Sequence, residues 1–360
     1  MHRGTFLGSF ACVVVARLLT SSAAADGFGT GPNAFQIEFV TIGDAGNPGD
    51  TTGNPNPAGS VHYDYRIGKY EISESMIDKA NAAGGLGITK DARGPDMPAT
   101  SVDWFEAARF VNWLNVSDGH APAYKFDATG TFQLWAPGDA GYDAANLYRN
   151  TRAKYFLPSA DEWYKAAYYD PASGGYYDYP TGSDNLPDGL DFVGDPDFEA
   201  VFPENMSIGP NVFFDVGALS PYGTGGQGGN VDEWEETDYD LLNDNMFVRG
   251  LRGGAFKNSV GLSSAIRTYN PPGIGENSVG FRVASVVPEP SSFVIGLLAV
   301  VCSCSPGCEL PPRVYGAFSN PTFPSKPNAC AAGRKQRRRN QRLGDCGSKD
   351  ETSGAVQGFS

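Results

Sequence analysis

The sequence predicts a loop-rich domain that mixes a few strands with a few helices, an α+β fold. Alternating apolar and polar residues near the start predict strands, and two later segments show capping patterns followed by apolar residues at helical spacing. Between residues 168 and 229 the chain is dominated by Gly, Pro, Asp and Asn, with few periodic stretches. So long an irregular segment inside one domain implies that loops pack on loops.

Two strands are predicted near the start. Residues 35–39 alternate, and residues 44–59, rich in Gly, Pro and Asn, predict a loop. Residues 61–67 alternate again, with Val61, Tyr63, Tyr65 and Ile67 on one face. A turn at Gly68 and a short extended piece at residues 70–72 follow.

Three helices are predicted. The first covers residues 75–83 and stops at two glycines. The second lies within residues 101–114, where Asp103 and Glu106 form a capping pattern ahead of an apolar face at helical spacing. The third begins at Ser159, which forms an S-x-x-E capping box with Glu162.

The two ends of the chain differ from its middle. Residues 1–25 predict a secretory signal peptide, with a basic start, an apolar run at residues 10–16 and three alanines before Asp26. We therefore expect an exported, extracytoplasmic protein. Its domain would span residues 26–286, enough for one sizeable core, and all five tryptophans lie there.

Charge and cysteine content limit what this domain can do. The whole chain carries −14, but both ends are positive, which leaves about −20 on residues 26–286. Such a surface repels phosphate backbones, so we expect no nucleic-acid partner, and it suits divalent cations or neutral ligands. None of the six cysteines lies within residues 26–286, so the domain uses neither disulfides nor thiol chemistry.

Common catalytic motifs are absent. Apart from His2, the histidines are His62 and His120, and no G-x-S-x-G, H-E-x-x-H or P-loop sequence accompanies them. His62 falls on the polar side of a predicted strand, which indicates a surface residue. A G-x-G-x-x-G match at residues 223–228 has no buried strand before it and two acids after it, so it does not predict a dinucleotide site.

Seven short segments carry a family resemblance. In chain order they are YRIGKYEIS (65–73), MPATSVDW (97–104), YFLPSADEW (155–163), GNVDEW (229–234), RGLRGG (249–254), AIR (265–267) and GFR (280–282). They resemble the motifs of the formylglycine-generating enzyme family, also called the sulfatase-modifying factor domain. With the strand before them, they span about residues 35–285. The resemblance implies a loop-rich α+β fold of the C-type-lectin-like kind.

The same resemblance argues against the family's oxidase activity. In active members a cysteine pair follows Gly-Gly-Ser, binds copper and oxidises a sulfatase cysteine to formylglycine. Counted from Gly254, the serine position is Ala255, the two cysteine positions are Asn258 and Ser263, and Arg267 retains the family's arginine. Asn and Ser supply no thiolate for Cu(I), so we expect no copper. The histidine cluster of the related iron-dependent sulfoxide synthases is also missing.

The resemblance further implies calcium. By analogy with the family's site, Gly229 and Val231 would offer backbone carbonyls and Glu233 a carboxylate, the hard oxygen ligands that Ca²⁺ prefers. Asn205 would match a second site. Gly226, however, stands where the family has a side-chain ligand. The alternative left open is that Glu233 is a buried, hydrogen-bonding strut.

The C-terminal segment predicts sorting. VPEPSSF, at residues 287–293, resembles the PEP-CTERM signal, which implies sorting machinery at the membrane as a partner and a signal over residues 287–301. The apolar stretch, residues 293–301, is much shorter than the ~20 residues of a membrane span, and a basic run comes only at residues 334–339. Residues 302–360 are expected to be disordered, and both a natural tail and a frameshifted gene end remain open.

Three functions follow from these observations. The first is an exported pseudoenzyme at the cell surface or in the extracellular matrix that lacks the oxidase cysteines and binds a glycan or peptide in its lectin-like pocket. The second is an enzyme that uses other groups in that pocket, such as Arg267 and nearby acids. The third is a structural matrix protein.

Overall fold

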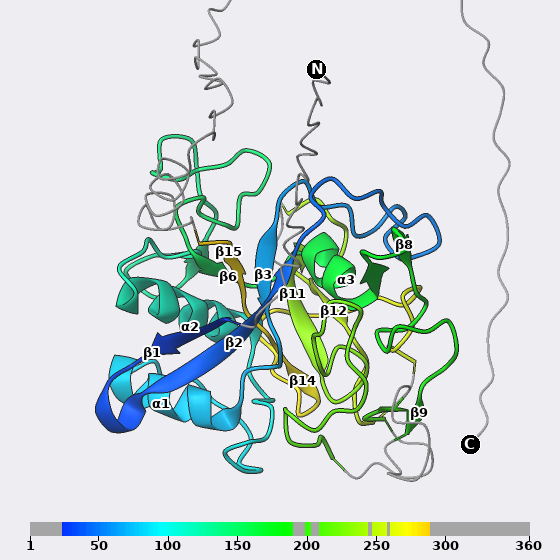
Figure 1. Cartoon of the computed structure of the whole chain (residues 1–360). Coiled ribbons are helices and arrows are strands. Elements are labelled where there is room, and N and C mark those ends of the chain that lie inside the picture. The colour runs from blue at the N-terminus through cyan, green and yellow to red at the C-terminus, as the bar shows by residue number, and fades with distance from the viewer. Residues whose placement is uncertain (1–23, 190–198, 203–208, 244–246, 258–259, 289–360) are drawn as a thin grey trace, which may run out of the picture. The chain divides into compact units, whose positions relative to one another are not determined.

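The structure is a computed structural model that describes residues 24–189, 199–202, 209–243, 247–257 and 260–288 (Figure 1). The described residues form one compact unit. The signal segment before Ala24 and the tail from residue 289 lie outside the described residues. The first strand begins at Ala24, two residues before the expected cleavage point. No helix in the described part of the chain is long and apolar enough to cross a membrane.

A five-stranded sheet joins the two ends of the domain. Its order is β1 (Ala24–Phe28), β2 (Phe35–Ile42), β3 (Tyr65–Gly68), β15 (Ala284–Val286) and β6 (Tyr155–Phe156), all antiparallel to their neighbours. Because β15 inserts between β3 and β6, the last strand of the domain completes the sheet that the first strands begin.

Three α-helices form in the described part of the chain, over the segments where the sequence predicts helices. They are α1 (Glu74–Gly84), α2 (Trp104–Ser117) and α3 (Ala160–Tyr168). Both predicted capping boxes are present, Asp103 with Glu106 and Ser159 with Glu162. Each box satisfies backbone N–H groups that would otherwise lack partners in the first turn.

A second sheet, of four strands, lies to the right of β2 and β3 in Figure 1. Its order is β13 (Thr268–Asn270), β12 (Arg249–Arg252), β11 (Asp232–Asp238) and β14 (Val279–Gly280). The central strand β11 runs antiparallel to β12 and parallel to β14. It carries the residues on which the candidate sites depend.

The remaining regular structure is short. Its elements are a 3-10 turn (Gly31–Asn33) and the strand pairs β4–β5 (Lys125–Phe126, Phe132–Gln133), β7–β8 (Tyr169–Asp170, Gly175–Tyr176) and β9–β10 (Asp188–Gly189, Glu199–Ala200). Within residues 168–229 the described strands have two residues each, as the irregular composition predicts.

One detail of the predicted strands is wrong. The strand expected over residues 61–67 begins only at Tyr65, and Tyr63 does not join its apolar face. The Tyr63 side chain is 50 % exposed, and its hydroxyl donates a hydrogen bond to Glu162. The predicted extended piece at residues 70–72 belongs to none of the named strands; the Ile72 N–H donates to the carbonyl of Phe281, and the Ile72 carbonyl accepts from the Ala99 amide. Both His62 and His120 are exposed, as predicted for His62.

Candidate functional site

The central strand β11 is a row of buried acids, each paired with arginine. Glu233, Glu235, Glu236 and Asp238 are fully buried. Their partners are Arg282 for Glu233 (2.6 Å), Arg252 and Arg267 for Glu235 (2.9 and 2.7 Å), Arg149 for Glu236 (2.9 Å) and Arg249 for Asp238. A buried carboxylate without a counter-charge is very costly, so these pairings hold the second sheet in one arrangement.

Arg267, predicted as a pocket residue, belongs to this row. Its Nε donates to Glu235 at 2.7 Å, and its Nη1 donates to the carbonyl of Tyr239 at 2.6 Å. Its Nη2 also donates to the carbonyl of Asp238 at 3.0 Å. The side chain is buried, so its guanidinium is engaged in holding the end of β11.

The other predicted pocket positions supply little chemistry. Ala255 is buried, and Ser263 is half-buried, with its Oγ accepting a hydrogen bond from the Ala265 amide. The backbones of Gly254 and Gly261 lie so close that a Cβ on Gly254 would sit 3.1 Å from Gly261. Asn258 lies outside the described residues.

The predicted calcium ligand Glu233 already has three donors. Arg282 donates to both carboxylate oxygens at 2.6 Å, and the indole N–H of Trp163 donates to Oε2 at 2.8 Å. These contacts favour the alternative of a buried strut. Gly229 and Val231 are buried beside it, and Asn205 lies outside the described residues. No cluster of three or more His, Cys, Asp or Glu suited to a metal occurs in the described part of the chain.

A different carboxylate has a free oxygen at this place. Glu71 is fully buried; its Oε1 accepts a hydrogen bond from Asn230 at 3.0 Å, and its Oε2 has no partner. A Cβ on Gly226 would lie 2.5–2.6 Å from both oxygens, so Glu71 fills the space of the side chain that Gly226 lacks. Burial raises the pKa of Glu71 to about 8, with Arg282 lowering it and Glu233 raising it further. A cation bound beside Gly226 would therefore be coordinated by Glu71, and calcium binding stays a prediction.

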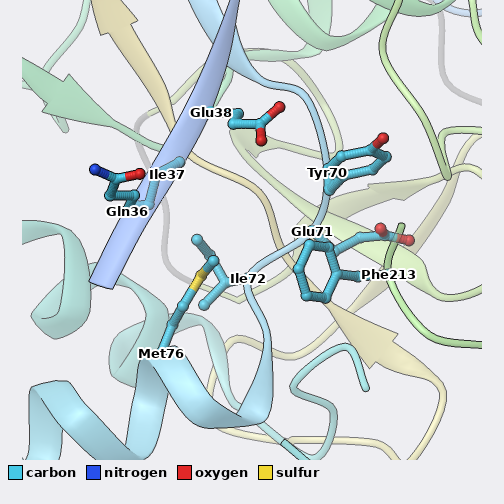
Figure 2. Close-up of a pocket in the computed structure, with 8 residues that line it drawn as sticks. All are labelled: Gln36, Ile37, Glu38, Tyr70, Glu71, Ile72, Met76 and Phe213. Carbon is cyan, nitrogen blue, oxygen red and sulfur yellow. The ribbon is translucent and has the colours of Figure 1, made fainter. Parts of the chain in front are cut away.

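A small pocket lies beside Glu71 (Figure 2). Its volume is about 100 Å³, and its walls include Ile37, Ile72, Met76 and Phe213. In Figure 2 the Glu71 carboxylate points away from Ile37 and Met76. The pocket also has polar walls, from Gln36, Glu38 and Glu71, and it is much smaller than ordinary small-molecule sites.

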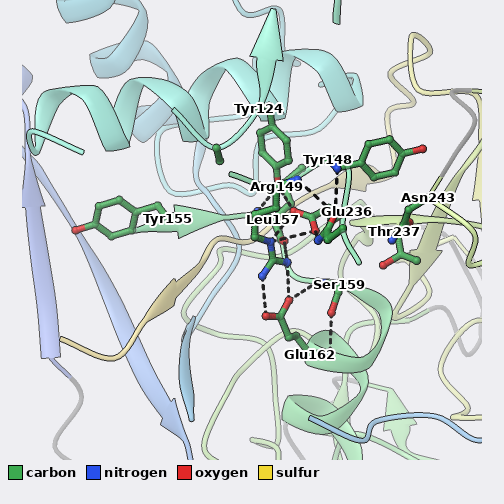
Figure 3. A network of polar contacts seen from close by, with 12 residues as sticks. Tyr124, Tyr148, Arg149, Tyr155, Leu157, Ser159, Glu162, Glu236, Thr237 and Asn243 are labelled. Atoms are coloured by element: carbon green, nitrogen blue, oxygen red, sulfur yellow. Dashed lines mark hydrogen bonds and ion pairs between the residues drawn. The ribbon is translucent and has the colours of Figure 1, made fainter. Parts of the chain in front are cut away.

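A second network surrounds Arg149 (Figure 3). Its guanidinium bridges Glu162, at 2.8 and 2.9 Å, and Glu236, at 2.9 Å, and stacks 3.7 Å from the centre of the Phe156 ring. Burial by itself raises the pKa of Glu162, but the charge and hydrogen bonds of Arg149 outweigh it, and the pKa lies below its usual value. Tyr63 donates to the same carboxylate at 2.7 Å.

A cavity of about 320 Å³ opens beside this network, and we call it the Arg149 pocket. It is lined by Tyr63, Asp143, Asn146, Arg149, Asn150, Thr151, Ala153, Phe156 and Val286. The sequence gives no local signal for it, because Arg149 meets Glu236 across 87 positions of the chain. The signal in the sequence that could have indicated this network is the acid-rich segment at residues 232–238. If such a segment is buried, its carboxylates need arginines from other parts of the chain.

Most of the chain matches the model of a known protein family. The profile of the sulfatase-modifying factor enzyme 1-like domain matches residues 40–287, more than half of the chain. The chain belongs to this family. The predicted loop-rich α+β fold of the family is confirmed by the structure and by its structural neighbours.

Two solved structures share the fold. Treponema denticola variable protein 1 is 18 % identical, with a TM-score of 0.52, and the match covers 74 % of this chain and all of that one. The crystal structure of CarF is 20 % identical, with a TM-score of 0.53, covering 70 % of this chain and 99 % of CarF. No curated protein sequence matches this sulfatase-modifying factor domain protein.

Proposed function

We propose that this chain is a ligand-binding member of the sulfatase-modifying factor family without the family's oxidase activity. The observation that carries the proposal is the loss of the reactive thiols. Asn258 and Ser263 stand at the two cysteine positions, Ala255 replaces the serine, and residues 26–286 contain no cysteine at all. Copper(I) binding and thiol oxidation need thiolates, which these side chains cannot supply.

The hydrogen bonds of Arg267 within the protein support a ligand-binding function over a catalytic one. The alternative of an enzyme that uses Arg267 requires its guanidinium to face a substrate, whereas Arg267 is buried and bonded to Glu235 and to backbone carbonyls. The Arg149 pocket, at about 320 Å³, has the volume of small-molecule sites. A ligand, glycan or peptide, therefore has a place to bind outside the positions of the lost cysteines.

Location completes the proposal. The signal-like residues 1–25 and the PEP-CTERM-like motif at residues 287–301 support export, followed by sorting to the cell surface or extracellular matrix. In that setting a cysteine-free domain avoids unwanted disulfide formation.

Two assays test the proposed function. Full chain incubated with copper, oxygen and a sulfatase peptide should yield no aldehyde by mass spectrometry, while a cysteine-containing family member serves as positive control. Formation of formylglycine would contradict the proposal. Reproducible binding on a glycan or peptide array supports the proposed ligand-binding function. Absence of binding on both arrays favours a structural matrix protein.

A further inference from the structure

We infer that the Arg149 pocket binds an uncharged sugar residue. The inference rests on the proposed ligand-binding function and goes further, because it names the site and the class of ligand. It depends on the polar groups of the pocket floor, on an exposed aromatic ring and on the balance of charge.

The floor offers a hydrogen-bond donor. Arg149 Nε donates to Glu236, and Nη2 donates to Glu162 and to the carbonyl of Leu157. Nη1 donates to Glu162 alone, which leaves one of its two N–H groups without a partner in the described part of the chain. Since Arg149 lines the pocket with 13 % of its side chain exposed, a ligand oxygen can accept from this group.

Acceptors lie on the same walls. Asp143 is half-buried; its Oδ1 accepts from the Ala145 amide at 2.9 Å, and its Oδ2 accepts no hydrogen bond from the described residues. The Tyr63 hydroxyl donates its proton to Glu162 and so keeps an oxygen lone pair for a ligand. A hydroxyl group both donates and accepts, so neighbouring sugar hydroxyls match this mixture of donor and acceptors.

The wall and the size fit one or two sugar rings. Tyr63 is 50 % exposed, and its ring is held in place by the hydroxyl bond to Glu162 and by an edge contact with Tyr65, 6.3 Å between ring centres. A fixed aromatic ring offers a flat apolar surface for the C–H face of a sugar at low entropic cost. The volume, about 320 Å³, lies at the lower end of small-molecule sites.

The charges select an uncharged ligand. Asp143, Glu162 and Glu236 outnumber the single cation Arg149, so the site repels an anion. An ammonium group near Asp143 would approach the Arg149 guanidinium, which repels it in turn. The carboxylates of Glu162 and Glu236 already accept several hydrogen bonds. Their contacts with a cation would therefore not compensate for the loss of its hydration.

The test uses the full chain and three sets of methyl glycosides: neutral sugars, uronic acids and protonated amino sugars. We expect a neutral glycoside to bind best by calorimetric titration. Tyr63→Ala and Asp143→Asn should each weaken it by about tenfold, the loss expected for one aromatic contact or one hydrogen bond to a charged group. Tyr63→Phe keeps the ring but removes the hydroxyl, so it should weaken binding less than Tyr63→Ala does, which separates the contribution of the ring from that of the hydroxyl.

The matched control is Tyr269→Ala, which removes another tyrosine that is 57 % exposed and does not line the pocket. Thermal melts check that every variant is folded. Neutral binding that depends on Tyr269 and not on Tyr63 or Asp143 overturns the site and leaves the proposed function intact. Preference for uronic acids or amino sugars, or binding on the peptide array alone, overturns the ligand class. Absence of binding to every glycoside and peptide rejects the proposed function together with the inference.

Discussion

The two sheets of this domain are stabilised in opposite ways. The five-stranded sheet packs apolar residues such as Phe39 and Ile67 against the buried face of α2, including Val111 and Leu114. In the four-stranded sheet, β11 instead buries four acids that are paired with five arginines. Apolar burial dominates the first sheet, whereas the second depends in addition on partners for its four buried acids.

This difference changes how each half responds to mutation. Apolar packing loses stability in small steps as methyl groups are removed. A buried ion pair contributes little net free energy over an apolar pair, yet removing one partner leaves an uncompensated charge and costs about 3–5 kcal/mol. We therefore expect the ion-paired half to be the less tolerant one.

The largest expected effect is that of Glu235→Gln. This substitution leaves Arg252 and Arg267 without their shared carboxylate, and we expect the free energy of unfolding to fall by about 3–5 kcal/mol. Urea denaturation measures it. Ile67→Val, in the apolar half, should cost only about 0.5–1.5 kcal/mol.

The surface control for this comparison is Glu38→Gln, whose pair with Lys69 is long, 3.9 Å, and half exposed. It should cost less than about 1 kcal/mol. If Glu235→Gln were as mild as Glu38→Gln, the contrast between the two sheets would be wrong.

An intermediate effect is expected for Glu162→Gln, and it should depend on pH. Because the pKa of Glu162 lies below its usual value of 4.5, its charged form stabilises the fold at neutral pH. That stabilisation is present above about pH 4.5 and is lost as the pH falls through the pKa of the folded state. The variant should thus be less stable than the parent by about 2 kcal/mol at pH 7, with a smaller difference at pH 3.

Urea denaturation of both proteins at pH 7, 5 and 3 measures this difference, with Glu38→Gln, at an exposed ion pair, as the control variant. If the difference in unfolding free energy between the parent and Glu162→Gln stays constant from pH 7 to pH 3, the ion pair of Arg149 with Glu162 is not the source of the stabilisation.

The smallest expected effect is that of calcium. If Ca²⁺ binds with a dissociation constant of about 0.1–1 mM, the range of extracellular modules, 1 mM Ca²⁺ should stabilise the fold by about 1 kcal/mol. That corresponds to a rise in Tm of about 2–4 °C for a domain of this size. The bound calcium ion would add a positive charge near the second sheet, where arginines already neutralise the buried acids.

Two variants locate the ion. Glu71→Gln removes the carboxylate with the unpartnered oxygen while keeping an acceptor for Asn230, so it should abolish the rise in Tm. Glu233→Gln should also abolish it, but it breaks the Arg282 pair as well. A parent melt indifferent to millimolar Ca²⁺ would identify Glu233 as a strut alone.

Local patterns predicted much of the fold. The capping residues Asp103 and Ser159 mark the starts of α2 and α3, and residues 35–39 predict most of β2, because caps and strand alternation depend on neighbours within a few residues. The ordered motifs indicated the family, and the composition alone established that no cysteine lies in residues 26–286.

Only the folded chain revealed which distant groups meet. Tyr63 leaves its predicted face because Glu162, 99 positions away, accepts its hydroxyl. Arg267 and Glu233, expected at a pocket and at a metal site, form ion pairs with Glu235 and Arg282. An acid-rich segment such as residues 232–238 has the pattern of a solvated strand until its arginines are known. Those arginines come from positions 149 to 282, and pairing over such separations leaves no periodic trace in the sequence.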